Sequence, residues 1–248
     1  MVYLIIGALA AKVALGEGGA TTDRNGALRA IYEQPFGKLL LAIVALGLVG
    51  YAVWSVVQAL VDPEHHGAAG KGVATRVGYG VVGLSYAALA LAALQLVRGT
   101  GNGGKSSDTT TQDWTARLLA LPFGPLVVIL VGLVVIGVAV AVFYRAYTAE
   151  FQQRLDLSGV GAQTRAGVIA LGRAGYAALG VVFSIVGVFL IIAALRHNAG
   201  AAKGLGGALR ALAQQPYGQV VLGIVAIGLV AYGLFSLAQA RYRRLGTA

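Results

Sequence analysis

One short motif occurs three times in this chain, and each copy opens a long apolar run. The copies are Gln34-Pro35-Phe36-Gly37, Leu121-Pro122-Phe123-Gly124 and Gln215-Pro216-Tyr217-Gly218. Each copy precedes roughly 20 almost wholly apolar residues, the length that a helix needs to cross the hydrocarbon core of a bilayer. A threefold repeat that carries membrane spans therefore constrains the architecture more than any single residue does.

The composition excludes an ordinary soluble domain. Hydrophobic residues make up 58% of the chain and charged residues 11%, whereas soluble domains carry about 25% charged residues. The chain has no cysteine, which excludes disulfides, thiolate metal sites and cysteine nucleophiles. Its formal net charge is +10. Because the cations lie between the apolar runs and no nucleic-acid recognition motif accompanies them, we expect contacts with anionic lipid headgroups and none with nucleic acid.

Six apolar segments are candidates for membrane spans. They are Val2 to Leu15, Leu39 to Leu60, Val77 to Val97, Leu126 to Tyr144, Ala174 to Leu195, and Val220 to Ala240. The first segment is shorter than the others, and the repeat would begin its helix before Met1, so we expect a first helix truncated at its N-terminus. A secretory signal peptide is the alternative, but the basic segment that opens such a peptide is missing.

The segment before each second span is also repeated. Gly26-Ala27-Leu28-Arg29-Ala30-Ile31 recurs as Gly207-Ala208-Leu209-Arg210-Ala211-Leu212. The i, i+3 spacing of its apolar residues predicts a short amphipathic helix at the membrane interface. The proline that follows ends this helix and begins the spanning one, and the aromatic residue after the proline suits the headgroup level.

These patterns predict an all-α membrane protein with six transmembrane helices. The helices are expected to form three tandem hairpins, related by a pseudo-threefold axis along the membrane normal, with a short interfacial helix before the second helix of each unit. The units are residues 1–61, 73–148 and 165–245, within one membrane domain. Cations are divided almost evenly between the two sides, so the dense cluster Arg241 to Arg244 is our reason to expect both termini in the cytoplasm.

The repeated motifs resemble those of a known bacterial family. The chain shows Arg-x-Gly-Tyr at the start of two spans, at Arg76 and Arg173, and Ala-Leu-Arg-Ala-x-x-x-Gln-Pro-[Phe/Tyr]-Gly before the second span of two units. Both are similar to motifs of the bacterial domain of unknown function 1206 family. The resemblance covers the whole chain, although the middle unit lacks the glutamine before Pro122. It implies a multi-pass protein of the bacterial inner membrane and brings no catalytic residue, ligand or reaction.

Two sets of equivalent residues are candidates for function. Gln58, Arg145 and Gln239 hold equivalent positions near the ends of the second helices, where a pore would need a polar ring around its axis. Snorkelling or capping at the membrane boundary is the alternative that we favour. The small-residue pairs Gly83-x-x-x-Ala87 and Gly180-x-x-x-Ser184 predict close helix packing, with a ligand groove as the alternative.

The sequence offers little to an enzyme or a metal ion. Asp62, Glu64, His65 and His66 are of types that bind transition metals, but adjacent histidines point in different directions and the other repeats lack the motif. We therefore favour a solvated loop and predict no metal site and no cofactor. No nucleophile–base pair occurs, and the six spans contain no Asp or Glu, which argues against a proton-coupled carrier.

We therefore predict a structural or accessory membrane protein that is not an enzyme. Its expected partners are the lipid bilayer, in particular anionic lipids, and another membrane protein. One alternative is a small channel or transporter along the pseudo-threefold axis. A second alternative is an accessory subunit of a larger membrane complex that binds a pigment or a quinone.

Overall fold

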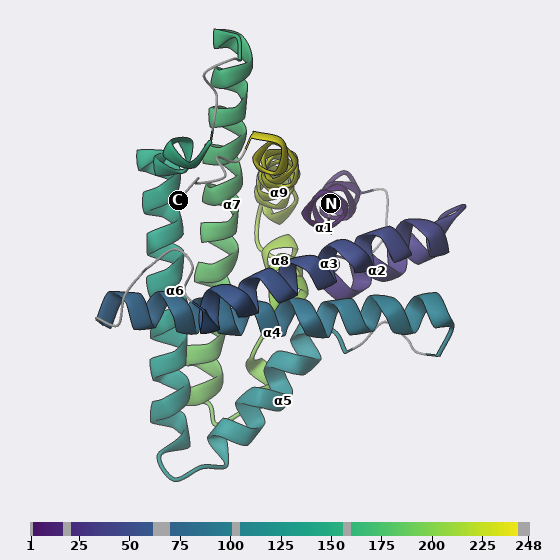
Figure 1. Cartoon of the computed structure of the whole chain (residues 1–248). Coiled ribbons are helices and arrows are strands. Elements are labelled where there is room, and N and C mark those ends of the chain that lie inside the picture. Colours follow the sequence, from purple (N-terminus) through teal and green to yellow (C-terminus); the bar gives the residue numbers. More distant parts are fainter. Residues whose placement is uncertain (1, 17–20, 62–69, 101–104, 156–159, 243–248) are drawn as a thin grey trace. The chain divides into compact units, whose positions relative to one another are not determined.

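The described residues of the computed structural model are helical apart from turns and short connections. They are residues 2–16, 21–61, 70–100, 105–155 and 160–242. Within them lie α1 (Val2–Ala14), α2 (Arg24–Tyr32), α3 (Gly37–Leu60), α4 (Gly70–Arg98), α5 (Ser107–Leu119), α6 (Gly124–Thr148), α7 (Ala162–Leu195), α8 (Leu205–Ala213) and α9 (Gly218–Tyr242) (Figure 1). Two short 3-10 helices, η1 (Glu150–Arg154) and η2 (Ala199–Ala201), complete the elements.

Five of the described helices are long and apolar enough to cross a membrane. They are α3, α4 from Thr75 to Arg98, α6, α7 and α9. The first predicted span, α1, has 13 residues, fewer than the roughly 20 that a bilayer core requires. The prediction of an all-α chain with several membrane-length helices is therefore confirmed, and short helices do precede α3, α6 and α9. The arrangement of six spans in three hairpins is not confirmed.

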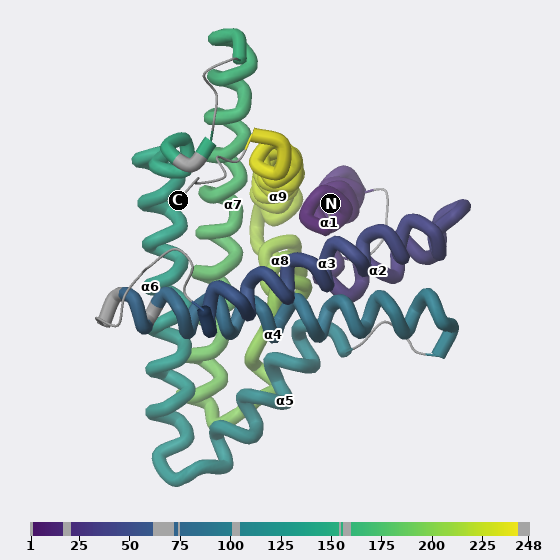
Figure 2. The backbone as a smooth tube through the Cα atoms, viewed as in Figure 1, coloured from purple at the N-terminus to yellow at the C-terminus, as the bar shows by residue number. Residues whose placement is uncertain are grey.

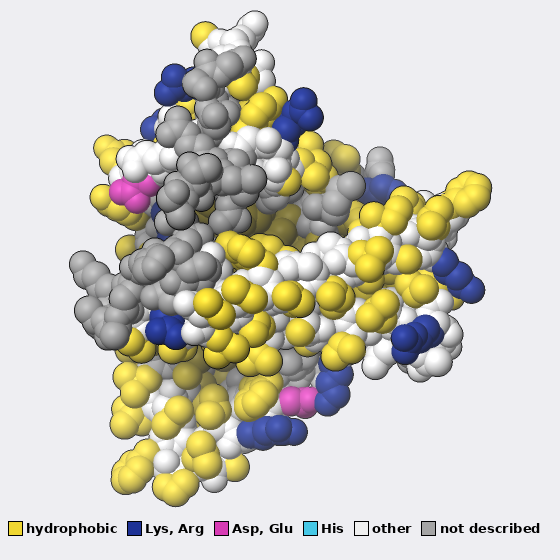
Figure 3. Space-filling view, in the orientation of Figure 1, with side chains coloured by type: hydrophobic (Ala, Val, Ile, Leu, Met, Phe, Trp, Pro, Cys, Tyr) yellow, Lys and Arg dark blue, Asp and Glu magenta, His cyan; other side chains and the backbone are white. Residues whose placement is uncertain are grey.

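The long helices carry large apolar side chains on their outer faces. Leu46 on α3, Val134 on α6 and Ile227 on α9 are each about two-thirds exposed or more. Figure 3 shows hydrophobic side chains gathered along the visible faces of α3 and α6. A soluble protein seldom leaves apolar patches of this extent in water, whereas lipid tails are a suitable solvent for them. The surface therefore fits a membrane protein.

The chain divides into two compact units, each of which packs within itself. One unit comprises residues 1–24 and 106–248, and the other comprises residues 25–105. In the smaller unit, α3 and α4 lie side by side as a hairpin (Figure 1). In the larger unit, α6 packs on α7, α1 packs on α9, and α7 also contacts α9. The closest helix pairs thus join the second helix of one sequence repeat to the first helix of another, and the first and last helices of the chain pair in the same way.

The two helix pairs of the larger unit cross one another. Figure 2 shows α1 and α9 nearly end-on, whereas α6 and α7 lie in the plane of the view, and α9 is in contact with α7. Contact between α7 and α9 joins the two helix pairs of this unit.

Small residues set the closest approach of each pair. A Cβ atom placed on Gly7 of α1 would lie 2.8 Å from the carbonyl oxygen of Ala226 on α9. A Cβ atom on Gly187 of α7 would lie 3.0 Å from the carbonyl oxygen of Gly132 on α6. These two crossing points occupy equivalent positions in the sequence repeat, and the corresponding residue of α4, Ala90, is buried. Backbones can approach this closely only where side chains are small.

Candidate functional site

Three turns with the same hydrogen bond open α3, α6 and α9. In each, the glycine N–H donates to the carbonyl oxygen three residues earlier. The distances are 2.8 Å from Gly37 to Gln34, 2.8 Å from Gly124 to Leu121 and 2.7 Å from Gly218 to Gln215. The aromatic residue of each turn has a positive φ, which is 60° at Phe36, 61° at Phe123 and 60° at Tyr217. Proline at the second position and a positive φ at the third are the features of a type II turn.

The glycine of each turn has no room for a side chain. A Cβ atom on Gly124 would lie 2.5 Å from the carbonyl oxygens of both Leu118 and Leu119, at the end of α5. Cβ atoms on Gly37 and Gly218 would likewise overlap the last carbonyl groups of α2 and α8. Because these obstacles are backbone atoms, they cannot rotate away as a side chain can. Each short helix is therefore held directly against the start of the long helix that follows it.

The aromatic rings of these turns project away from the described protein. Phe36 is 83% exposed, Phe123 is 81% exposed and Tyr217 is 85% exposed. Within the described residues, none of the three rings contacts another aromatic ring or a cation. The left-handed conformation costs a non-glycine residue roughly 1–2 kcal/mol. Each turn thus holds a large apolar ring in a strained backbone conformation without an internal partner for the ring.

A second candidate site, in the larger unit, is a cluster of five aromatic rings. Tyr232 of α9 lies 5.0 Å from Tyr3 of α1 and 5.5 Å from Tyr176 of α7, measured between ring centroids. Phe235 lies 4.8 Å from Phe151 of η1 and 5.8 Å from Tyr176. Phe235 and Phe151 are buried. Edge-to-face contacts of this kind stabilise the packing of α1, α7 and α9. At the edge of the cluster, Arg24 donates a hydrogen bond to the Tyr3 hydroxyl at 2.7 Å.

The smaller unit contains a related cluster at equivalent repeat positions. Tyr51 of α3 lies 4.5 Å from Tyr86 of α4, and Trp54 lies 5.6 Å from Tyr79. In the repeat register, Tyr51 and Tyr86 correspond to the pair Tyr232 and Tyr3 of the larger unit. The same aromatic contact therefore recurs in two helix pairs.

Two carboxylates cap the short helices of the larger unit. Asp23, which is buried, accepts a hydrogen bond from the backbone N–H of Ser107, the first residue of α5. Asp108, one residue further on, accepts from the N–H groups of Gly204, at 2.8 Å, and Gly207, at 2.9 Å, at the start of α8. A carboxylate at a helix N-terminus satisfies free N–H groups and opposes the positive end of the helix dipole. These bonds tie together three loops that are far apart in sequence.

The sequence pattern does not predict this pair of carboxylate caps. The only local signal is Ser106-Ser107-Asp108 before a helix, and Ser106 does cap α5 by accepting from the N–H of Thr109 at 3.1 Å. α5 has 13 residues, whereas α2 and α8 have nine each, and the extra turn supplies Asp108. The segment before and at the start of α5, which departs most from the repeat, therefore links the loops before α2 and α8.

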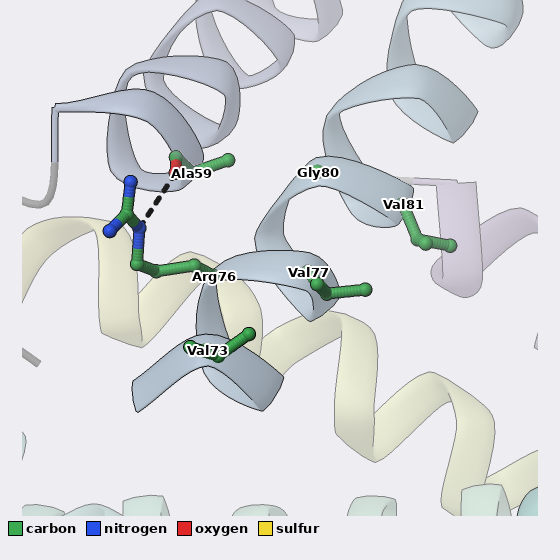
Figure 4. A pocket seen from close by; sticks show the side chains of 6 residues that line it. All are labelled: Ala59, Val73, Arg76, Val77, Gly80 and Val81. Atoms are coloured by element: carbon green, nitrogen blue, oxygen red, sulfur yellow. Dashed lines mark hydrogen bonds between the residues drawn. The ribbon is translucent and has the colours of Figure 1, made fainter. Parts of the chain in front are cut away.

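The arginines of the Arg-x-Gly-Tyr motif cap the preceding long helices. Arg76 of α4 donates to the carbonyl oxygens of Ala59, at 2.9 Å, and Leu60, at 3.1 Å, at the end of α3 (Figure 4). Arg173 of α7 donates to the carbonyl oxygen of Tyr147, at 3.2 Å, near the end of α6. Leu60 and Tyr147 are equivalent in the repeat. A cation at the C-terminus of a helix is favoured by the free carbonyls and by the dipole.

A shallow groove of about 430 Å³ lies beside Arg76 in the smaller unit (Figure 4). Its lining residues are Ala59, Val73, Arg76, Val77, Gly80 and Val81. Apart from the arginine, which is already engaged with the end of α3, this lining is apolar. It contains no side chain that can act as a nucleophile, a general base or a metal ligand.

The predicted polar ring is not assembled by the residues that share a unit. Arg145 is exposed on α6 and Gln239 is half-buried on α9, and within the described residues their side chains form no hydrogen bond or ion pair. Gln58 is buried on α3, in the other unit. The ring therefore stays a prediction.

Two of the four predicted packing residues, Gly83 and Gly180, lie close to a neighbouring helix. A Cβ atom on Gly83 would lie 3.0 Å from the side chain of Val56 on α3, and one on Gly180 would lie 2.9 Å from the ring of Phe143 on α6. Ser184 donates to the carbonyl oxygen of Gly180 at 2.9 Å, within its own helix. Ala87, the fourth of these residues, is half-buried.

The histidine loop, Asp62 to His66, lies outside the described residues. Among the residues that are described, no group of three or more His, Cys, Asp or Glu side chains is placed to hold a metal ion.

Comparison with known proteins identifies a family that matches this chain. The sequence profile described as Domain of Unknown Function (DUF1206) matches residues 1–62, 77–149 and 174–243. The chain is also 36% identical over 244 residues to the "Uncharacterized protein YxxB" of Bacillus subtilis (strain 168), an alignment that covers 98% of this chain and 87% of that relative. No solved structure matches the chain.

Proposed function

The chain belongs to the Domain of Unknown Function (DUF1206) family, and from this premise we propose that it is a multi-pass membrane protein with a structural or accessory role. In this proposal it resides in the bacterial inner membrane with cytoplasmic termini. It binds anionic lipids and a second membrane protein, and it has no catalytic centre.

The observation that carries the proposal is the aromatic and apolar packing between helices of the larger unit, together with the apolar outer faces of the long helices. The contact of α1, α7 and α9 is filled by the five-ring aromatic cluster and by small apolar residues. The outer faces of the long helices are rich in exposed leucine, valine and isoleucine. A protein that moves a solute or converts a substrate needs polar groups inside its membrane segments. An apolar bundle is better suited to contact with lipid and with other helices.

The charge balance supports anionic lipid as a partner. Lys and Arg number 19 and Asp and Glu number 9, so at least ten cations cannot be neutralised by side chains of this chain. Two of the nine acids, Asp23 and Asp108, are engaged with helix N-termini. Basic residues next to membrane spans are attracted to anionic headgroups by about 1 kcal/mol each.

We also retain the pseudo-threefold arrangement of repeat units as part of the proposal. Its support is the repetition of the same crossing, Gly7 with Ala226 and Gly187 with Gly132, at equivalent positions of two helix pairs. The repeated arginine caps at Arg76 and Arg173 are a second support.

The test is extraction in lipid nanodiscs, followed by native mass spectrometry and by lipid analysis of the purified particle. We expect enrichment of anionic lipid over the bulk membrane and a stoichiometric membrane-protein partner. Purified protein in liposomes is expected to show no ion or solute flux. A solute-selective flux that is lost in Gln58→Leu or Gln239→Leu variants would replace the proposal with a channel. A stoichiometric pigment or quinone in the particle would also overturn it.

A further inference from the structure

The aromatic residues of the three turns are not required by the backbone that holds them. A type II turn needs a positive φ at its third position, and glycine or asparagine meets that need with the least strain. The chain instead places Phe36, Phe123 and Tyr217 there, at φ values of 60° to 61°. A bulky residue in this region of conformational space is an outlier. The same outlier occurs in three separate turns of one chain. A peculiarity of one loop therefore does not explain it.

The rings do not stabilise the described fold either. Their exposed fractions are 81% to 85%, and no aromatic or cationic partner within the described residues contacts them. The neighbouring glycines fix the turn by their close approach to the short helices, and that approach does not involve the rings. A strained residue without an internal contact is a reason to look for its function outside the chain.

The position of the rings indicates what they contact. Each ring stands one residue before a long apolar helix, and these helices have 24 residues in α3, 25 in α6 and 25 in α9. A ring at the end of a segment of this length lies at the level where headgroups meet acyl chains, which aromatic side chains favour. Lys38, exposed beside Phe36, can reach the phosphates of the same lipids.

We propose that Phe36, Phe123 and Tyr217 are membrane-interface anchors. Each rigid turn holds its ring in the boundary between lipid headgroups and acyl chains, and each ring sets the depth at which its own long helix sits. This inference rests on the proposed membrane role. Its occupant is the lipid interface, not a protein partner and not a second copy of the chain.

The test uses single tryptophans as depth reporters. The two native tryptophans are first replaced, as Trp54→Phe and Trp114→Phe, and one tryptophan is then placed at Phe36, Phe123 or Tyr217. The full chain is reconstituted in vesicles of phosphatidylcholine and phosphatidylglycerol that contain lipids brominated at shallow or deep acyl positions. We expect shallow bromines to quench each turn tryptophan about twofold more than deep ones.

A matched control separates this inference from the membrane proposal. Val134→Trp lies near the middle of α6 and is exposed, so deep bromines should quench it more than shallow ones. If no brominated lipid quenches this control, the membrane role itself fails. If the control behaves as expected but the turn tryptophans emit as in water or are shielded from both lipid and aqueous quenchers, only the anchor inference fails. Shielding from both would indicate a protein contact instead.

A second variant set tests whether the rings act outside the fold. The triple variant Phe36→Asn, Phe123→Asn and Tyr217→Asn removes the rings and places asparagine, which tolerates a positive φ, at all three positions. We expect its thermal unfolding temperature in detergent to be equal to or higher than that of the parent. In vesicles, the depth profile of Val134→Trp should broaden or shift. A lower unfolding temperature in detergent would show that the rings support the fold, and an unchanged depth profile would show that they do not set depth. Either result overturns the inference.

Discussion

The turn glycines offer the sharpest test of the packing described above, and Gly124→Ala is the variant that we would make first. Its Cβ atom would lie 2.5 Å from two carbonyl oxygens of α5, whereas real Cβ atoms essentially never approach closer than 3.0 Å. The backbone must therefore open by about half an ångström between α5 and α6. The opening strains the Gly124–Leu121 hydrogen bond of 2.8 Å and the Val127–Phe123 hydrogen bond of 3.1 Å.

The expected loss follows from these two bonds and the disturbed helix contact. A net hydrogen bond contributes about 0.5–1.5 kcal/mol, so we expect a destabilisation of about 2–4 kcal/mol once the contact is included. For a chain of this size, roughly 2–4 °C of unfolding temperature corresponds to each kcal/mol, which predicts a decrease on the order of 5–15 °C. Thermal unfolding in detergent, followed by circular dichroism, measures this decrease.

The control lies on the same helix. Gly137 has no atom within 4 Å of the place where its Cβ would be, and alanine is the better helix former by about 1 kcal/mol. Gly137→Ala should therefore unfold at the same temperature as the parent or somewhat higher. If Gly124→Ala and Gly137→Ala unfold alike, the turn is not the rigid contact that the structure indicates, and the reasoning above is refuted.

Three further predictions concern the helix ends and the pairing of the first and last helices. In a chain without cysteine, Ala14→Cys with Gly223→Cys should form a disulfide on mild oxidation, because the two Cβ positions are 3.7 Å apart; altered migration on a non-reducing gel detects it. Asp108→Ala should lower the stability in detergent by about 1–3 kcal/mol, because it removes both hydrogen bonds to the start of α8. Arg173→Ala should lower it by only about 0.5–1 kcal/mol, because the contact with Tyr147 is exposed, and hydrogen exchange should increase in the last turn of α6.

Each of these has a control and a contrary result. Ala8 is exposed on another face of α1, so the control pair Ala8→Cys with Gly223→Cys should not form a disulfide. Equal cross-linking of the control pair and the Ala14–Gly223 pair would argue against the α1–α9 contact. Thr110→Ala, an exposed change on α5, should leave the unfolding temperature unchanged. If Asp108→Ala is as stable as Thr110→Ala, the carboxylate does not cap α8. Faster exchange along the whole of α6 in Arg173→Ala would indicate a global effect instead of a cap.

The local features of this protein could be predicted from its sequence. Long apolar runs produce helices of membrane length. The prolines at 35, 122 and 216 separate a short helix from a long one in all three sequence repeats. Both results follow from the properties of neighbouring residues, because helix length depends on hydrophobic extent and a proline cannot continue a helix. The small pairs that begin at Gly83 and Gly180 were predicted on the same grounds, and the structure places these two glycines close to a neighbouring helix.

The pairing of helices was decided only in three dimensions. The long helices are apolar all round, so no polar face marks the side that meets lipid, and the sequence does not reveal which face packs on which partner. The capping of α8 by Asp108 and the pairing of α1 with α9 join residues about 100 and more than 200 positions apart, respectively. The left-handed aromatic turns were also beyond local rules, because those rules would place glycine or asparagine at Phe36, Phe123 and Tyr217. Such features depend on long-range contacts or on the surroundings, and neither is encoded in the preferences of adjacent residues.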